Sequence, residues 1–345
     1  MTVSKKLQRQ LKKAFGSADF DQEILGAMTK LKSLSSLNSD QETIMKYAEG
    51  LQIFFETVQA AYEQSDKMLA MTNRSLSISS EELNLSNSKL KDLNRTVQSL
   101  LNNLGEGLKA ARDIQQSLMP PLHQDFEAMS IDVLYHPSED LSGDFFDVYQ
   151  KENFLYFYLA DVTSHGTASA QVTYLIKGIF QEIMTNSAAP LDLNFLIKDF
   201  ARRYVDYKLS YAVGLQMYKF DLNSKVIEAC ASNAPSPILV RTGVSQQISV
   251  NPGPLIFSNS FDVNYEFMTQ KETLLPGDSV YCFTDGAIEL NKTGANSDFN
   301  EKKFAKVLSQ VPREDWEQAI LKALTTVAGK LTFDDDITII RLNMK

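Results

Sequence analysis

Carboxylates stand beside apolar segments in four separate parts of the sequence, and this placement is the chain's clearest sign of chemistry. Asp161 closes one apolar run, and Asp285 follows another and precedes a glycine. Asp144 lies in the segment Leu-Ser-Gly-Asp-Phe-Phe-Asp, and an acidic triplet at 334–336 precedes a further apolar run. A strand that ends in aspartate holds its carboxylate rigidly at the rim of a core, which is where a binding site needs it.

Several carboxylates that converge on one point favour a bound cation, because they otherwise repel and raise one another's pKa. Ligation by oxygen alone suits hard ions such as Mg²⁺ or Mn²⁺ rather than zinc. Two such ions bridged by water can form hydroxide near neutral pH and clamp a phosphoryl group. Any one of these aspartates alone is more typical of a turn or a helix cap. The hypothesis of a two-metal site therefore depends on the four segments meeting in the fold.

Composition and charge exclude several classes of protein. The chain has 345 residues, 43% of them hydrophobic, and carries 34 Lys and Arg against 43 Asp and Glu, a net charge of −9. This charge argues against a protein built to bind nucleic acid. The sequence has no apolar run of transmembrane length and no apolar secretory signal. The two cysteines, Cys230 and Cys282, lie in apolar runs, which predicts buried free thiols and a cytoplasmic protein.

The first third of the chain is predicted to be helical, since all ten prolines lie after residue 119. We expect a helical regulatory and dimerisation domain over 1–75, then a coiled-coil linker helix over 76–119. Apolar residues recur at intervals of seven over this stretch, which indicates a coiled-coil seam. The row consists of Leu69, Leu76, Leu83, Leu90, Val97, Leu104, Ala111 and Leu118. Such a seam needs a partner, and a second copy of the chain in a parallel homodimer is the simplest one. The alternative is a long helix that packs back on its own bundle.

The remainder, 120–345, is predicted to be an α+β layered domain. Segments rich in β-branched and aromatic residues predict strands over 131–135, 154–160, 212–220, 225–231, 279–284 and 337–342. Apolar residues at helical spacing predict helices over 168–185, 193–207, 301–308 and 316–328.

Five motifs, in order along residues 110–342, resemble the SpoIIE/RsbU-type branch of the metal-dependent (2C-type, PPM) serine/threonine protein phosphatases. The motifs are Ala-Arg-Asp-Ile-Gln-Gln-Ser-Leu-Met-Pro at 111–120, Ser-Gly-Asp-Phe-Phe-Asp at 142–147, Asp-Val-Thr-Ser-His-Gly at 161–166, Leu-Pro-Gly-Asp with Phe-Thr-Asp-Gly at 275–286, and Asp-Asp-Ile-Thr at 335–338. Five ordered motifs are far more specific than any one of them, and the resemblance covers about two-thirds of the chain.

The resemblance implies an α-β-β-α sandwich with two Mn²⁺ or Mg²⁺ ions at one edge, preceded here by the all-α bundle and coiled-coil linker. It implies hydrolysis of a phosphoserine or phosphothreonine by a metal-bridging hydroxide. The residues that would carry the metals and the catalysis are Asp144, Asp161, Asp285 and Asp335, with the carbonyl of Val162 as a further ligand. Secondary candidates within the motifs are Asp147, His165, Gly143, Gly286 and Asp336.

The same resemblance implies a role in bacterial signalling by partner switching. Proteins of this branch remove a phosphate from a small STAS-domain antagonist protein, which then captures an anti-sigma factor or a kinase-like partner. Their N-terminal regions receive a signal, which a helical linker relays to the phosphatase. The predicted helical dimer fits this plan, and the resemblance implies no nucleic-acid partner.

The sequence departs from the family pattern at three places. Ser142 and Ser164 replace glycines, and a motif that usually reads Asn-Ala-Gly-His-x-Pro is Cys-Ala-Ser-Asn-Ala-Pro at 230–235. If position 164 requires a positive φ, serine is strained there. These departures motivate an alternative function, a catalytically impaired scaffold that binds a signalling partner without turnover. The four retained carboxylates favour an active enzyme.

Overall fold

The computed structural model describes residues 26, 29–30, 41–164, 166–258, 260–290, 299–330 and 332–345. The chain divides into two compact units, Met1–Leu100 and Leu101–Lys345. Most of the first 40 residues, where a helical bundle is expected, lie outside the described residues, so the boundaries at 75 and 119 stay predictions. No helix in the described part of the chain is both long and apolar enough to cross a membrane.

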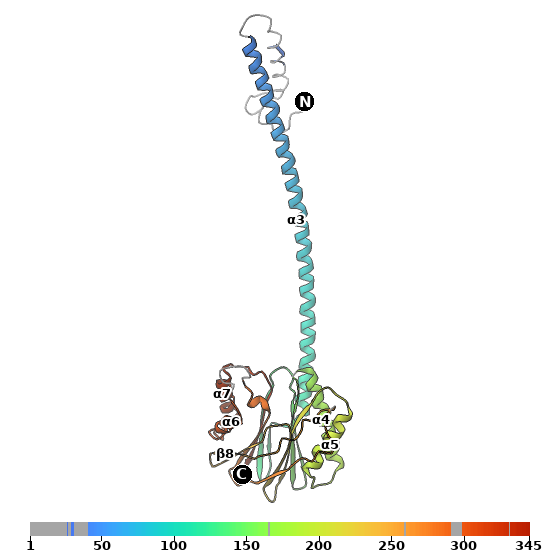
Figure 1. Ribbon diagram of the computed structural model, residues 1–345, viewed down its shortest axis with the longest axis vertical. Coiled ribbons are helices and arrows are strands. Elements are labelled where there is room, and N and C mark those ends of the chain that lie inside the picture. Colours follow the sequence, from blue (N-terminus) through green and yellow to red (C-terminus); the bar gives the residue numbers. More distant parts are fainter. Residues whose placement is uncertain are drawn as a thin grey trace. The chain divides into compact units, whose positions relative to one another are not determined.

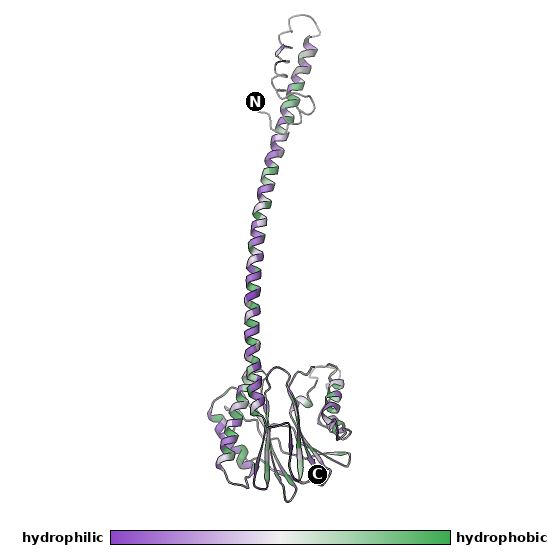
Figure 2. Ribbon diagram, turned by 180° about the vertical axis from the view of Figure 1, so that it is seen from behind, coloured by the Kyte–Doolittle hydropathy of each residue, from purple (hydrophilic) through white to green (hydrophobic). Residues whose placement is uncertain are grey.

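One helix, α3 (Gln41–Leu118), accounts for nearly all of the described part of the first unit and continues into the second. Its 78 residues contain no proline, so no backbone donor is missing along its length. In the first unit, apolar residues of the heptad row such as Leu83 and Leu90 are 64% and 60% exposed. Figure 2 shows apolar and polar residues alternating along the helix. Among the described residues of the first unit, the leucines of this row therefore remain largely exposed.

The second unit contains two antiparallel sheets that pack face to face (Figure 1). Sheet A has the strand order β1 (His123–Asp125), β2 (Met129–His136), β11 (Ile337–Met344), β10 (Ser279–Phe283), β7 (Ile238–Arg241) and β8 (Val244–Gln247). Sheet B has the order β3 (Asp144–Lys151), β4 (Phe154–Val162), β5 (Val213–Asp221), β6 (Val226–Ser232) and β9 (Gln270–Thr273).

Helices cover the outer face of each sheet, which confirms the predicted α-β-β-α sandwich. Against sheet B pack α4 (Thr167–Asn186) and α5 (Leu193–Asp206), and against sheet A pack α6 (Glu301–Leu308) and α7 (Trp316–Ala328). Side chains of β4 alternate between layers, since Tyr156 and Tyr158 face the helices while Phe157 faces the other sheet. Cys230 and Cys282 are buried and free, as predicted.

All six predicted strands and all four predicted helices of this unit are present, but five strands were missed. The most consequential omission is β3, since this strand carries Asp144. It was missed because the acidic residues Asp144 and Asp147 interrupt its apolar pattern. Both are nevertheless almost fully buried, at 1% and 5% exposure. Their partners come from segments distant in the sequence, so local hydrophobicity gives no sign of this strand.

The end of α3 corrects one detail of the coiled-coil prediction. Leu118, the last residue of the heptad row, packs against the core formed by sheet B, α4 and α5. Residues 101–118 of the helix belong to the second compact unit. The final turn of the predicted seam therefore packs on its own domain, because its apolar side chains find a buried surface there.

Candidate active site

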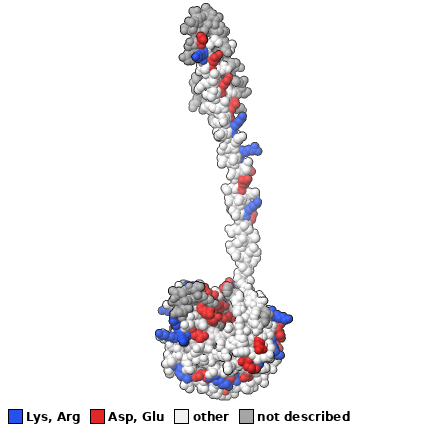
Figure 3. Space-filling view, in the orientation of Figure 1, with Lys and Arg blue, Asp and Glu red and all other residues white. Residues whose placement is uncertain are grey.

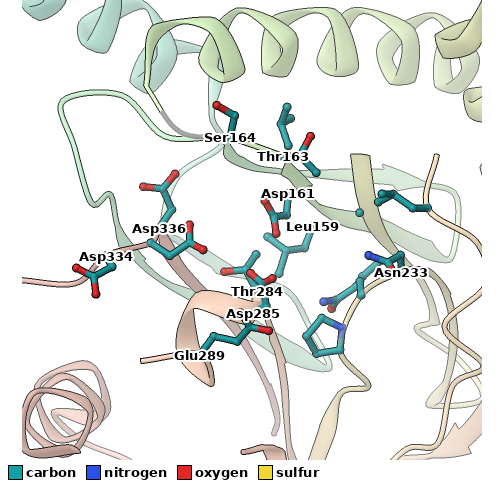
Figure 4. A pocket seen from close by; sticks show the side chains of 17 residues that line it. Leu159, Asp161, Thr163, Ser164, Asn233, Thr284, Asp285, Glu289, Asp334 and Asp336 are labelled. Carbon is teal, nitrogen blue, oxygen red and sulfur yellow. Dashed lines mark hydrogen bonds between the residues drawn. The ribbon is translucent and has the colours of Figure 1, made fainter. Parts of the chain in front are cut away.

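A pocket of about 460 Å³ opens at one edge of the two sheets. Figure 3 shows acidic side chains gathered around a hollow in this unit, and Figure 4 shows the pocket from close by. Among the described residues of the lining, six are acidic and none is Lys or Arg: Asp161, Asp285, Glu289, Asp334, Asp335 and Asp336. The lining therefore has a strong excess of negative charge.

Three of the four predicted metal carboxylates line this pocket, each from a different strand end. Asp161 lies near the end of β4, and Asp285 begins the short 3₁₀ helix η1 (Asp285–Ala287) after β10. Asp335 lies in the loop before β11. Val162, predicted to offer its carbonyl, also lines the pocket. The fold thus brings together segments that are far apart in the chain.

The fourth carboxylate, Asp144, lies buried beside the pocket rather than in its lining. It pairs across the β3–β4 ladder with Asp161. Its Oδ2 accepts hydrogen bonds from Thr284 Oγ1 at 2.9 Å and Thr338 Oγ1 at 2.6 Å. Burial raises the pKa of Asp144 well above its usual range, and the neighbouring Asp161 and Asp336 raise it further.

Electrostatic repulsion within the pocket is the clearest sign that it suits a cation. Burial raises the pKa of Asp161, and the charges of Asp285 and Asp335 add to the effect. In the part of the chain that is described, no three acidic, His or Cys side chains form a ready-made metal site. The donors are all oxygen, however, and hard divalent ions favour such donors. The donor chemistry therefore fits Mn²⁺ or Mg²⁺.

Replacing Asp161 by Asn should stabilise the metal-free protein at neutral pH. Because the folded state raises the pKa of Asp161, ionisation of this carboxyl costs stability above its unfolded pKa of about 3.9. We expect the free energy of unfolding of Asp161→Asn to exceed that of the wild type at pH 7, because the variant has no charge to bury at this position. The difference should shrink toward pH 4.

Urea unfolding in EDTA at several pH values measures this difference. Repeating it with Mn²⁺ should reverse the order, because only the wild type then gains full ligand-binding stabilisation. If the difference in free energy of unfolding between variant and wild type is the same at pH 4 and pH 8, ionisation of Asp161 does not destabilise the metal-free protein, and the prediction is wrong.

Asp336, a secondary candidate, has both carboxylate oxygens engaged by the protein. Its Oδ1 accepts from the backbone N–H and the hydroxyl of Ser138, at 2.7 and 2.9 Å. Its Oδ2 accepts from the backbone N–H of Gly143 at 2.7 Å. Asp336 therefore ties the loop that carries Asp335 to the segment that enters β3.

Of two other secondary candidates, the structure describes only Asp147, which stands apart from the pocket. Asp147 forms an ion pair with Lys177 of α4 at 2.8 Å, accepts from the N–H of Val148, and does not line the pocket. The structure thus places it in the packing of α4 on sheet B. His165 lies outside the described residues.

The remaining secondary candidates, Gly143 and Gly286, permit close approach of backbone segments. A Cβ at Gly286 would lie 2.0 Å from the carbonyl oxygen of Asp336, and one at Gly143 would lie 2.9 Å from that of Val162. No side chain fits at such distances. The glycines therefore allow the loops that carry the acids to meet.

Ser164 has a φ of +80°, which confirms the strain anticipated from the sequence. We expect Ser164→Gly to raise the free energy of unfolding by about 0.5–1 kcal/mol, after the greater entropy of glycine in the unfolded chain is subtracted. Ser187→Gly is the matched control, because Ser187 has an ordinary φ of −106° and should show no gain. Equal effects of the two substitutions in thermal or urea unfolding would count against strain at Ser164.

The sequence did not identify the residues that support the carboxylates. Thr284 and Thr338 hold Asp144, although both stand inside the motifs Phe-Thr-Asp-Gly and Asp-Asp-Ile-Thr. Asn233, Ala234 and Pro235, from the altered sixth motif, line the pocket together with Gln216. A hydroxyl within two residues of a motif aspartate was the available signal for the threonines.

Comparisons with known proteins agree with this geometry. Residues 151–345 match the family described as Stage II sporulation protein E (SpoIIE). A segment of 91 residues is 35% identical to the phosphoserine phosphatase RsbP of Bacillus subtilis (strain 168). That match covers 26% of this chain and 22% of RsbP, so it spans only about a fifth of the relative.

Solved structures of low sequence identity share the fold. The SiaA-PP2C domain of Pseudomonas aeruginosa superposes with a TM-score of 0.61 at 17% identity, covering 72% of this chain and 98% of that domain. A structure of RsbU and RsbW domains from Mycobacterium tuberculosis gives 0.52 at 18% identity, covering 66% of this chain and 62% of that one. The PP2C phosphatase domain of SpoIIE from Bacillus subtilis, with a regulatory fragment, gives 0.51 at 14%, covering 65% and 62%. The second unit therefore has the PP2C-type fold.

Proposed function

The chain belongs to the SpoIIE family, and we propose from this that it is a protein serine/threonine phosphatase that acts in bacterial signalling in the cytoplasm. The observation that carries the proposal is the meeting of Asp161, Asp285 and Asp335, from three separate strand ends, in one acidic pocket. A site whose described lining carries so much like charge and no Lys or Arg is poorly suited to bind a phosphate by itself. Bound divalent cations would offset the negative charge of the carboxylates and make the pocket attractive to a phosphate.

We propose that two Mn²⁺ or Mg²⁺ ions occupy the pocket when the enzyme is active. Asp144, Asp161, Asp285 and Asp335 would hold them, with the carbonyl of Val162 as a further ligand. Bound ions supply charge neutralisation and the acidity that makes water a nucleophile near neutral pH. This is the chemistry that direct hydrolysis of a phosphoserine or phosphothreonine requires.

The chain's own residues position these groups. The hydroxyls of Thr284 and Thr338 hold one oxygen of Asp144, and Asp336 holds the loop of Asp335 against Gly143. Asn233 and Pro235 also line the pocket, where the amide of Asn233 would be available to a phosphorylated side chain. Fixed donors and acceptors of this kind lower the cost of reorganisation during reaction.

Phosphate release from a phosphoserine peptide tests the proposal directly. We expect turnover by the purified full chain with Mn²⁺, none in EDTA, and little on a phosphotyrosine peptide. Binding of Mn²⁺ without any turnover would favour the alternative, a phosphatase-fold scaffold, for which Ser164 and the altered motif at 230–235 are the motivating observations. Absence of both binding and turnover from a folded protein would refute the proposal.

For the natural substrate we propose a phosphorylated STAS-domain antagonist protein, in a partner-switching pathway. The support is the family itself and the similarity of part of the chain to RsbP. Release of phosphate from such a protein at a much higher kcat/KM than from its isolated phosphopeptide would support this substrate class.

We propose that the exposed heptad row of α3 forms a parallel homodimer that regulates the phosphatase. Leu90, in the row, and Leu85, outside it, are 60% and 59% exposed on the same helix. We expect the full chain to sediment as a dimer and Leu90→Lys to weaken the dimer at least about tenfold, because a charge in the seam is costly. Leu85→Lys is the control and should sediment like the wild type. A monomeric wild type at micromolar concentration would contradict the dimer.

A further inference from the structure

The last turns of α3 carry a buried amide whose surroundings are unusual for a helix surface. Gln115 is 2% exposed, although its neighbours Ile114 and Gln116 are both exposed. A polar side chain buried to this degree is normally held by specific partners, because an unpaired amide is costly in an apolar environment. The contacts of Gln115 therefore indicate what the residue does.

Gln115 pairs in both directions with the backbone of one residue, Ser142. Its Nε2 donates to the carbonyl oxygen of Ser142 at 2.8 Å, and its Oε1 accepts from the N–H of Ser142 at 3.2 Å. Nε2 also donates to Thr173 Oγ1 at 3.2 Å, while that hydroxyl donates to the carbonyl of Ala170. The side chain thus takes the place of a neighbouring strand for the segment that leads into β3.

The contacts of Ser142 and its successor lead directly to the carboxylates. The backbone N–H of Asp144 donates to Ser142 Oγ at 3.0 Å. The N–H of Gly143 donates to Oδ2 of Asp336, the residue beside Asp335. Each residue from 142 to 144 is therefore held by at least one hydrogen bond that links it to the carboxylates or to Gln115, and Gln115 anchors the first of the three.

Other contacts of α3 with its domain lack this connection. Arg112 pairs with Asp140 and donates to its carbonyl, and the hydroxyl of Tyr174 donates to the carbonyl of Ala111. These contacts hold the helix on the domain but do not touch residues 142–144. Gln115 is distinct because it contacts the segment that carries Asp144.

We propose that Gln115 is a positioning residue of the metal site, which sets the backbone of 142–144 so that the carboxylates of Asp144 and the Asp335 loop stand ready for a divalent cation. The inference rests on the proposed metal-dependent phosphatase function. It adds that an element outside the sandwich, the end of α3, contributes a residue on which cation affinity depends.

Gln115→Met tests this role, because methionine keeps the length of the side chain and its apolar packing but removes all three hydrogen bonds. Gln116→Met is the matched control on the exposed side of the same turn. Mn²⁺ affinity is measured by calorimetry on the metal-free full chain, and the Mn²⁺ concentration for half-maximal phosphate release is measured separately. We expect about 10- to 100-fold weaker binding for Gln115→Met, as for other residues that orient metal ligands, and wild-type values for Gln116→Met.

The two measurements separate positioning from a merely structural role. If Gln115 only stabilises the fold, the variant loses thermal stability but binds Mn²⁺ like the wild type, and the proposal is overturned. If Gln115→Met does not fold, Gln115→Glu replaces it, because glutamate keeps the length and the acceptor for Ser142 N–H while it loses the donors. Glutamate should weaken Mn²⁺ binding as well, and unchanged affinity would overturn the proposal.

A final readout distinguishes failure of this inference from failure of the proposed function. If the wild type binds no Mn²⁺, the phosphatase proposal fails, but hydrogen exchange at the amides of Gly143 and Asp144 still tests Gln115. Faster exchange in Gln115→Met than in Gln116→Met supports its hold on 142–144, and equal exchange rejects it.

Discussion

Replacing Asp285 by Asn should lower kcat/KM for a phosphoserine peptide by at least about a thousandfold, which corresponds to about 4 kcal/mol of transition-state stabilisation. Asp285 lines the acidic pocket from the start of η1, and its charge is among those that raise the pKa of Asp161. Asparagine keeps the shape of the side chain but removes the charge that a divalent cation needs. Phosphate release with saturating Mn²⁺ measures the loss.

Asp221→Asn is the matched control for this prediction. Asp221 also ends a strand, β5, but its carboxylate accepts from the N–H of Asn223 at 2.9 Å and from the hydroxyl of Ser224, so it caps a turn. We expect its activity to stay within about twofold of wild type, since surface changes away from a site seldom matter much. An Asp285→Asn variant that keeps a Mn²⁺-dependent rate within tenfold of wild type would exclude Asp285 as a metal ligand.

Gly286→Ala should abolish most activity through geometry alone. A Cβ at this position would lie 2.0 Å from the carbonyl oxygen of Asp336 and 3.4 Å from the Cβ of Asp335. Because the nearest atoms are backbone, the loop itself must move. A displacement of about 1 Å at a catalytic constellation can cost about a hundredfold in rate, so we expect a loss of at least that size.

The control for Gly286→Ala is Gly178→Ala, in the exposed surface of α4. A Cβ at Gly178 meets nothing within 4 Å, so alanine should stabilise the helix by about 1 kcal/mol and leave kcat unchanged. Comparison of Mn²⁺ affinity and kcat/KM for the two variants tests the claim. Wild-type values of both for Gly286→Ala would show that the loop adapts without cost.

A substantial part of the fold could be predicted from the sequence, because the spacing of apolar residues along a helix or strand shows which of its faces is buried. The strands and helices of the second unit that carry continuous apolar patterns were found close to their observed ends. β3 was missed because the burial of Asp144 depends on Thr284, which directly follows β10, and on Thr338 of β11. A strand whose buried polar groups are satisfied from afar has no local signature.

For the site, the sequence by itself determined which side chains are available and that they stand at strand ends. Asp161, Asp285 and Asp335 were identified from that placement and from the order of the motifs, and each lines the pocket. Ser164 was identified as a position that is strained if its φ is positive, since serine replaces a glycine there, and the structure gives this residue a φ of +80°.

Only the tertiary structure decided how the acids divide among different tasks. Asp144 is buried under two threonine hydroxyls, Asp336 is engaged by Ser138 and Gly143, and Asp147 pairs with Lys177 away from the pocket. The decisive hydrogen bonds join residues 193 and 194 positions apart, Gly143 with Asp336 and Thr338 with Asp144. Hydrogen bonds that a carboxylate accepts from the protein fix its orientation and occupy some of its lone pairs, so they decide what it can offer to a cation. These hydrogen bonds depend on packing between the two sheets, which local sequence pattern does not encode.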